Sequence, residues 1–386
     1  MKRRKAQKAT TLFVLVAQIV LLLSTGAGCA KEASVPTTIM PEASSTPIEM
    51  PEKTVTVTDL MDRTVEVPRD PQRVVVIYSQ IPLAMKCLGV ELDKVVGVDE
   101  FTLRQYEQLI PELQGKSIVG QHFMKPDYEK IIDLEPQLVL ATSTTLKRTE
   151  IEEKLEPAGI KIIALDFKIK NLRKTLEVLA QIFGKEERAK EFADSWFGKL
   201  EEVQERVEGL NEEQRVRVYP EGTQRPYVAA GKGSTLDELI TLAGGINIAA
   251  GLKGRSPEVE PEWVMDQNPD VILKYPMGAE HQGGFGKEDT APFEEMRKEI
   301  AERPGFDQID AVKEGQVYIL SRDILGGMFE NVGVCYTAKI LYPETFEDLD
   351  PEAYLAEIVE KYLGLDFEPL RGVFVYPSPP VAEESQ

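Results

Sequence analysis

The chain has 386 residues, of which 42% are hydrophobic, and a formal net charge of −20 at pH 7. This length exceeds one typical domain and fits two, and the apolar content is sufficient for packed cores. The acidic balance disfavours nucleic acid as a partner, because phosphate binding needs clustered basic charge.

The first 28 residues are typical of an export signal. A basic start, "MKRRKAQK", precedes the apolar run Leu12 to Leu23 and the small residues of "STGAGC". The run is shorter than the ~20 apolar residues of a membrane span. Because "GAGC" resembles a lipobox, we expect cleavage before Cys29 and a lipid on its sulfur; cleavage elsewhere and an uncleaved anchor are the alternatives. Either way, the body lies on the extracytoplasmic face of the cell membrane.

Residues 29–53 are rich in Pro, Ser, Thr and Glu and show no apolar period, which predicts a flexible tether. Beyond Cys29, the chain has only Cys87 and Cys335. We interpret them as two buried thiols in different lobes, not as a disulfide. The cysteine count thus predicts neither a disulfide framework nor a metal cluster.

After the tether, short β-branched runs alternate with helical stretches. Residues 54–68 alternate on both sides of a polar turn and predict a β-hairpin. The pattern predicts a first α/β lobe over 54–184, with a mainly parallel sheet. Its strands are expected at 73–78, 95–99, 117–120, 138–142 and 161–166.

One long amphipathic helix is predicted from Lys185 to Leu210, where apolar residues recur at steps of three or four. A second α/β lobe (211–365) and a C-terminal tail (366–386) follow. Strands are expected at 215–220, 226–230, 270–275 and 316–320, and helices at 236–243, 331–341 and 351–364. The fold class is therefore α/β, with two lobes of mainly parallel sheet joined by one long helix.

The segment "YEKIIDLEPQLVLA" (128–141) is repeated as "PEWVMDQNPDVILK" (261–274). Glu129 aligns with Glu262, and the prolines that end each helix align as well. The helix dipole favours a carboxylate in the first helical turn, so capping alone is one explanation of the two acids. A function shared by the two halves is the other.

The order of several segments resembles a known family. The segments are "DPQRVVVI", "YEKIIDLEPQLVL", "LEPAGIKIIALD", "GSTLDELITLAGGINIA", "EWVMDQNPDVILKY" and "ILYPETFEDLDPE". They resemble the substrate-binding proteins of ABC importers for siderophores, haem, corrinoids and related metal chelates, over nearly all of 54–365. The resemblance implies a monomer whose two lobes clasp a ligand, with an ABC permease and its ATPase as partners. It also implies that Glu129 and Glu262 dock on permease arginines.

Ligands of open α/β sheets bind beyond the carboxyl ends of the strands. The loops there combine aromatic rings with cations, which suits a bulky anionic or chelated ligand. The candidates in the first lobe are Tyr78, Phe101, Arg104, His122, Phe123, Thr142 and Ser143. In the second lobe they are Tyr227, Lys232, Arg255, Tyr275, Arg322 and Phe329. We interpret His122 as a hydrogen-bonding loop residue in preference to a metal ligand.

Other chemistry finds little support in the sequence. The glycine-rich "AAGKGSTLDE" (229–238) lacks P-loop spacing, and Thr235 with Glu238 fits a capping box. No HExxH, GxSxG or GxGxxG motif is present, and two histidines leave little general-base capacity, so we expect neither an enzyme nor a bound cofactor.

We therefore expect a lipid-anchored solute-binding protein that captures an iron(III) chelate, or a related metal complex, and delivers it to a permease. The alternatives are a binding protein for a metal oxyanion such as molybdate or tungstate, one for a corrinoid, or a tethered sensor without transport. The resemblance disfavours a corrinoid, because it implies tryptophans in the cleft loops of corrinoid binders and the candidate loops contain none.

Overall fold

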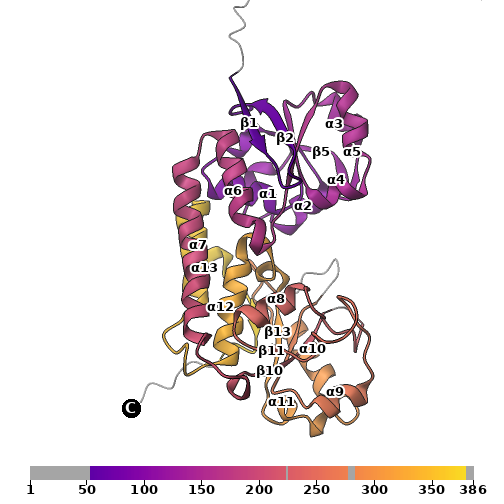
Figure 1. The fold of residues 1–386 in the computed structure, drawn as a ribbon, viewed down its shortest axis with the longest axis vertical. Coiled ribbons are helices and arrows are strands. Elements are labelled where there is room, and N and C mark those ends of the chain that lie inside the picture. The colour runs from indigo at the N-terminus through magenta and orange to yellow at the C-terminus, as the bar shows by residue number, and fades with distance from the viewer. Residues whose placement is uncertain (1–52, 223–224, 277–282, 380–386) are drawn as a thin grey trace, which may run out of the picture. The chain divides into compact units, whose positions relative to one another are not determined.

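Two five-stranded sheets organise the computed structural model, which describes residues 53–222, 225–276 and 283–379 (Figure 1). The signal sequence and Cys29 lie outside the described residues, as does the tether up to residue 52. No helix in the described ranges combines the length and the apolar character that a membrane crossing requires. The predicted α/β class is confirmed.

The first sheet has the strand order β5-β4-β3-β8-β9, and all its pairs are parallel. β3 and β8 are wholly buried, as expected of a parallel sheet covered on both faces. The strands are β3 (Val74–Ile77), β4 (Val95–Val98), β5 (Ser117–Ile118), β8 (Leu138–Thr142) and β9 (Lys161–Leu165). The helices are α1 (Gln80–Cys87), α2 (Glu100–Gln105), α3 (Tyr128–Asp133), α4 (Ser143–Arg148), α5 (Ile151–Leu155) and α6 (Ile169–Phe183).

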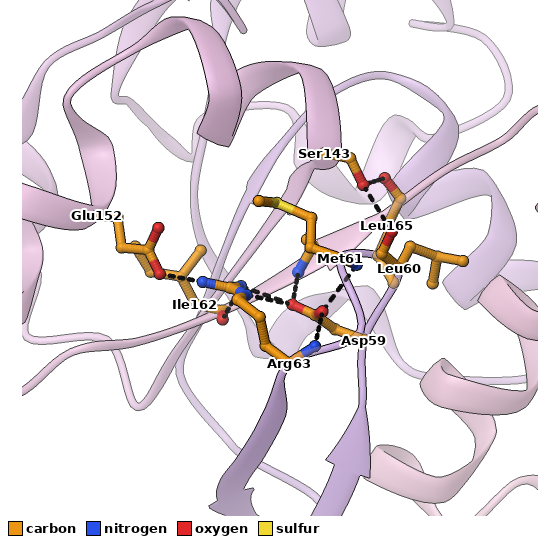
Figure 2. A network of polar contacts seen from close by, with 9 residues as sticks. Asp59, Leu60, Met61, Arg63, Ser143, Glu152, Ile162 and Leu165 are labelled. Carbon is orange, nitrogen blue, oxygen red and sulfur yellow. Dashed lines mark hydrogen bonds and ion pairs between the residues drawn. The ribbon is translucent and has the colours of Figure 1, made fainter.

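The predicted hairpin is present as β1 (Thr54–Thr58) and β2 (Thr64–Pro68), and a second, smaller hairpin pairs β6 (Gly120–His122) with β7 (Lys125–Pro126). The turn between β1 and β2 is fastened to the first sheet by Asp59, which is fully buried (Figure 2). Its carboxylate accepts from the Arg63 guanidinium at 2.6 Å and from the Ala164 N–H of β9 at 3.1 Å. Arg63 in turn pairs with Glu152 of α5. A buried charge thus joins three elements of the lobe.

Opposing effects act on the Asp59 carboxyl. Burial raises its pKa, but the hydrogen bonds from Arg63 and from three backbone N–H groups hold the pKa below its ordinary value. The ionised form is therefore the one that the fold stabilises.

The long helix is α7 (Glu186–Val207), slightly shorter than predicted. Its buried face includes Phe192, Trp196 and Val203, and it packs against α6 and α12 (Glu330–Leu341). Figure 1 shows α7 running beside α12 and α13 (Pro351–Glu357).

The second sheet has the order β11-β10-β12-β13-β14, with β14 antiparallel at its edge. Its strands are β10 (Arg217–Glu221), β11 (Ile246–Asn247), β12 (Val271–Lys274), β13 (Val317–Leu320) and β14 (Val375–Tyr376). Its helices are α8 (Thr235–Leu242), α9 (Pro261–Gln267), α10 (Ala291–Ala301) and α11 (Asp310–Lys313). Short 3-10 turns η6 (Arg322–Ile324) and η7 (Gly327–Phe329) lead into α12.

Two local expectations, the strand at 226–230 and the cap of α8, were wrong, and two others were incomplete. Residues 226–230 form isolated bridges and no strand. The helix expected at 351–364 is α-helical only to Glu357 and continues as a π-helical segment, Ile358–Tyr362. The expected tail contributes β14 to the sheet. Ser234, not Thr235, caps α8, and its hydroxyl accepts from the Asp237 N–H at 3.2 Å.

The two cysteines of the described chain behave as predicted. Cys87 of α1 and Cys335 of α12 are buried free thiols. Burial raises the pKa of each thiol to about 12, so both stay protonated and unreactive at neutral pH.

The Asp59 contacts predict a specific stability defect. We expect Asp59→Ala to lower the free energy of unfolding by about 3 kcal/mol, because it removes one partner of a buried ion pair. Since the pKa of Asp59 is lowered in the folded state, its contribution is present above the ordinary carboxyl pKa and is lost as pH falls through the folded value. Urea unfolding near neutral pH and at about pH 3 measures both effects.

Asp62→Asn is the matched control. Asp62 lies in the same turn, but its side chain is 89% exposed and pairs with Lys174 at the surface. Equal losses for the two substitutions would contradict the role given to Asp59.

Candidate functional site

Two adjoining cavities, of ≈ 240 and ≈ 260 Å³, lie between loops that follow the strands of both sheets. Tyr78, Phe123, Thr235, Gly326 and Gly327 line both cavities. Tyr78 follows β3, and Gly326 and Gly327 lie in the segment after β13. We call the two cavities together the cleft. It lies where open α/β sheets bind ligands, beyond the carboxyl ends of their strands.

The structure brings most of the predicted ligand-binding residues together at the cleft. Those that line it are Tyr78, Phe101, Phe123, Thr142, Ser143, Arg255, Tyr275 and Arg322. Those that do not line either cavity are Arg104, His122, Tyr227, Lys232 and Phe329.

The residues that miss the cleft do so for different reasons. Arg104 is exposed on α2 and pairs with Glu100 one turn earlier. Lys232 is exposed as well. Tyr227 packs against the core of the second lobe, and Phe329 is fully buried. The position of a residue in a loop therefore did not predict whether its side chain points toward solvent, toward the cleft or into the core.

His122 lies behind the aromatic wall of the cleft. Its ring contacts Phe123 and Phe101, with centroids 4.1 and 5.0 Å apart, and its Nδ1 accepts from the Met124 N–H at 3.3 Å. Burial, with the positive charge of Arg322 nearby, lowers the pKa of His122 and keeps the ring neutral. Within the described ranges, no three His, Cys, Asp or Glu side chains are grouped to hold a metal ion.

One end of the cleft is aromatic and cationic. The Arg322 guanidinium lies 5.5 Å from the centre of the Phe101 ring, a cation–π arrangement. Burial raises the pKa of Tyr78 and of Tyr275, so both remain neutral hydrogen-bond donors. Tyr78 has a φ of 142°, and such strained backbone occurs often at binding sites.

Thr142 and Ser143 line the cleft, and the hydroxyl groups of both residues already make contacts within the protein. The Thr142 hydroxyl caps α4 by accepting from the Thr145 N–H at 3.1 Å. The Ser143 hydroxyl contacts the carbonyl oxygens of Leu165 and Leu60 at 3.4 and 3.5 Å, which are long for hydrogen bonds (Figure 2). Ser143 thus links the cleft to the hairpin turn that Asp59 fastens.

The opposite end of the cleft carries carboxyl groups that sequence reasoning missed. Asp166 and Lys168 follow β9, Glu238 lies on α8, and Glu330 begins α12. Glu330 is only 3% exposed. Burial and the neighbouring Glu238 raise the pKa of Glu330 to about 8, and burial raises the pKa of Glu238 as well.

A buried hydrogen-bond chain fixes the floor of the cleft. The Met328 N–H donates to Gln80 Oε1 at 2.9 Å, and Gln80 Nε2 donates to the Tyr106 hydroxyl at 2.9 Å. The Met328 carbonyl accepts from Trp196 Nε1 of α7 at 3.0 Å. Residues of the first lobe and of the long helix therefore hold the backbone of the same residue of the second lobe.

A buried ion cluster lies at the carboxyl ends of β10 and β12. Glu221 is fully buried and accepts from Lys274 Nζ at 2.6 Å and from both terminal nitrogens of Arg303 at 2.7 and 2.9 Å. Burial raises the pKa of Glu221, but the two cations outweigh it and leave the pKa below its ordinary value. The cluster is satisfied internally, which suits a structural role in the second lobe.

Some of the missed cleft residues left a signal in the sequence and others did not. Asp166 ends a predicted strand and Lys168 follows it, in a loop as well placed as the loops that were considered. Glu238 was assigned to a capping box, and Glu330 directly precedes a predicted helix. Nothing in the sequence distinguishes a buried helix-start acid from an exposed one.

A larger cavity of ≈ 790 Å³ lies away from the cleft, beside the amino ends of β8 and β9. Its lining includes the β1–β2 hairpin and Ile132, an exposed apolar side chain of α3. It is at the opposite edge of the sheet from the expected ligand position, so its size alone does not make it the site.

Glu129 and Glu262 occupy the first turns of α3 and α9, as the repeat predicted. Both are exposed, and neither forms an ion pair or a side-chain hydrogen bond within the part of the chain that the structure describes. Asp127, not Glu129, caps α3, by accepting from the Lys130 N–H at 3.2 Å.

The family model for periplasmic binding proteins matches residues 74–324, which include most of both sheets and most of the residues that line the cleft. The chain belongs to this family. Its relatives include YvrC of Bacillus subtilis, named a substrate-binding lipoprotein of an ABC transporter, which is 25% identical over 73% of this chain and 83% of its own. The molybdate-binding protein MolA of Haemophilus influenzae is 23% identical over 78% of this chain and 89% of its own.

Among solved structures, the TroA-like periplasmic binding protein FepB of Veillonella parvula matches this binding protein with a TM-score of 0.72. The two sequences are 25% identical, and the match covers 83% of this chain and 99% of FepB. The sequence-based expectation of a two-lobe binding protein is therefore confirmed at the level of family and fold.

The burial of Glu330 predicts that replacing this residue stabilises the protein in a pH-dependent way. The pKa of Glu330 is raised in the folded state, so folding is favoured while the group is protonated and becomes less favourable as pH rises from the ordinary carboxyl value to about 8. We expect Glu330→Gln to raise Tm by a few degrees at about pH 8 and to change it little at about pH 4. Calorimetry at both pH values measures the difference, and a uniform loss of Tm would contradict it.

Proposed function

We propose that this binding protein is the lipid-anchored, extracytoplasmic component of an ABC importer. It captures an iron(III) chelate or a related metal complex in the cleft and delivers it to the permease. The observation that carries the proposal is the cleft itself, which aromatic rings and cations line from both lobes. The names of YvrC and MolA support transport-linked binding as the general activity.

The lining suits a chelate in size and chemistry. The two adjoining cavities have the dimensions of a small-molecule site. Rings such as Phe101 and Tyr275 offer flat apolar contact to an organic chelator. Arg322 and Arg255 offer charge-assisted hydrogen bonds to its anionic oxygens. The metal enters as part of the ligand and needs no protein side chain to coordinate it.

A metal oxyanion is the second candidate, and the similarity to MolA favours it. Arg322 and Arg255 would suit molybdate or tungstate as well. However, a four-oxygen anion fills only a few times the ~30 Å³ that one water occupies in the liquid. The cleft is much larger than that, and its aromatic lining would remain uncovered, which favours the chelate.

A ligand screen tests the proposal directly. We expect an Fe(III) chelate to bind one to one, to raise Tm and to quench tyrosine fluorescence. Arg322→Gln should weaken binding by about 1.5–3 kcal/mol, the range for hydrogen bonds to charged groups, which is roughly 10-fold to 150-fold in Kd. Arg104→Gln is the control, because Arg104 is an exposed arginine outside both cavities. Binding of oxyanions alone would favour the second candidate.

The exposed acids predict a defect confined to transport. Surface ion pairs contribute only about 0–1 kcal/mol to folding, so Glu129→Ala and Glu262→Ala should preserve Tm and ligand affinity. Uptake should fall sharply, since complementary charge sets encounter rate and register at an interface. Reversal to Arg should be worse, and reversing the permease arginines should partly restore uptake.

Glu205→Ala, an exposed acid on α7, is the control for these variants. Loss of Tm without a specific loss of uptake would show that Glu129 and Glu262 only stabilise their helices. Normal uptake in both variants would contradict the docking role of Glu129 and Glu262.

The lipid anchor is tested at Cys29, which lies outside the described residues. Cys29→Ser should block processing or release the protein from the membrane fraction, because the thiol that would carry the lipid is gone. Labelling with a fatty-acid analogue, followed by fractionation, measures this. Normal processing with unchanged membrane retention would exclude the anchor.

A further inference from the structure

Two carboxyl groups from different helices meet at one end of the cleft. Glu330 begins α12 and Glu238 lies on α8, and the two helices pack against each other. Both side chains line the smaller cavity, and after burial the charge of Glu238 and a hydrogen bond between the two carboxyls raise the pKa of Glu330. The backbone N–H of Gly327 acts in the opposite direction and lowers that pKa. Two carboxylates in such contact, one of them almost fully buried, do not both ionise readily.

The groups around this pair do not neutralise it by direct pairing. Within the described residues, no ion pair joins Glu330 or Glu238 to a cation. The Asp166 carboxylate is already engaged, because it accepts from the Lys168 N–H at 3.2 Å and from Asn171 Nδ2 at 2.7 Å. The titratable and charged groups that face the pair, or lie close enough to influence it, are Tyr78, Asp166, Lys168, Lys170, Asp237, Arg255 and Arg322.

The balance of charge then depends on one proton. Lys168 and Arg255 line the same cavity as the pair and as Asp166. With one proton on the pair, these two cations offset the two remaining negative charges, and Arg322 in the adjoining cavity makes the cleft favourable for an anion. With both carboxyls ionised, an additional buried negative charge faces the ligand, where water screens it poorly.

We propose that Glu238 and Glu330 determine specificity by holding one shared proton, which the cleft requires to accept an anionic, oxygen-bearing group of the ligand. The inference rests on the proposed function, because it assumes that the ligand of the cleft is anionic. Ligand binding and proton binding are then linked: a ligand that binds above the pKa of the pair takes up a proton from solvent with it.

The linkage has a defined sign and size. Burial and the neighbouring Glu238 raise the pKa of Glu330 to about 8, so the pair holds its proton at neutral pH. The apparent Kd equals the intrinsic Kd divided by the fraction of competent, protonated protein. Affinity for an anionic ligand should therefore be nearly constant below about pH 7 and roughly tenfold weaker at about pH 9.

The test uses two matched probes, an anionic Fe(III) tris-catecholate and a neutral Fe(III) tris-hydroxamate, titrated at about pH 7 and about pH 9. We expect the anionic chelate to lose roughly tenfold in affinity over this range and the neutral chelate to lose little. Calorimetry in two buffers of different ionisation enthalpy, at the higher pH, should show uptake of close to one proton per anionic ligand.

Three variants separate this role from a general electrostatic effect. Glu330→Gln and Glu238→Gln, which each leave at most one charge on the pair, should remove the proton uptake and bind the anionic chelate roughly tenfold more tightly than wild type at about pH 9. Glu299→Gln, at an exposed position on α10, should keep the wild-type profile.

The outcomes separate this inference from the proposed function. An anionic chelate that binds equally at both pH values, or a Glu330→Gln profile like that of wild type, would overturn the inference and leave the proposed function intact. Binding of the neutral chelate alone would also overturn it. Failure of both chelates at every pH would reject the proposed function, and the inference with it.

Discussion

The backbone of Met328 is the point on which the cleft depends. Gln80 of the first lobe accepts from its N–H, and Trp196 of the long helix donates to its carbonyl, and all three residues are buried, so losing either partner would leave a buried polar group unpaired. The residue before it must be glycine: Gly327 has a φ of 64°, and a Cβ there would lie 2.4 Å from the Gln80 amide carbon. The backbone that lines both cavities is thereby fixed relative to both sheets.

Because the backbone at the floor of the cleft is fixed, ligand recognition depends on side chains whose positions are set by the sheets and helices. The aromatic end contains Phe101 beneath Arg322, and the carboxyl end contains Glu238 beside Glu330. Low polarity in such a site strengthens attraction and repulsion alike. A ligand must therefore match both ends, and its charge matters as much as its size.

The sequence predicted those features that repeat over several residues. The apolar runs identified β8 and β9, and the helical period identified α7. The sequence did not predict β14, because a two-residue strand has no recognisable period. It predicted a strand at residues 226–230, but these residues form only isolated β-bridges in the described structure. In the cleft, strand ends located Tyr78 and Arg322 but not the buried direction of Phe329, which tertiary packing decides.

Acidic residues in the first turn of a helix show most clearly what the sequence could not predict, which is whether their side chains are exposed or buried. Glu129, Glu262 and Glu330 all lie in the first turns of their helices, yet the first two are exposed and the third is buried. A helix dipole stabilises such a carboxylate by about 0.3–1 kcal/mol. Each pKa unit corresponds to about 1.4 kcal/mol, so holding Glu330 protonated at neutral pH costs the fold on the order of 3 kcal/mol. Because the dipole favours only the ionised form that burial suppresses, capping does not account for Glu330, and its position in the cleft supports the proposed role in ligand binding.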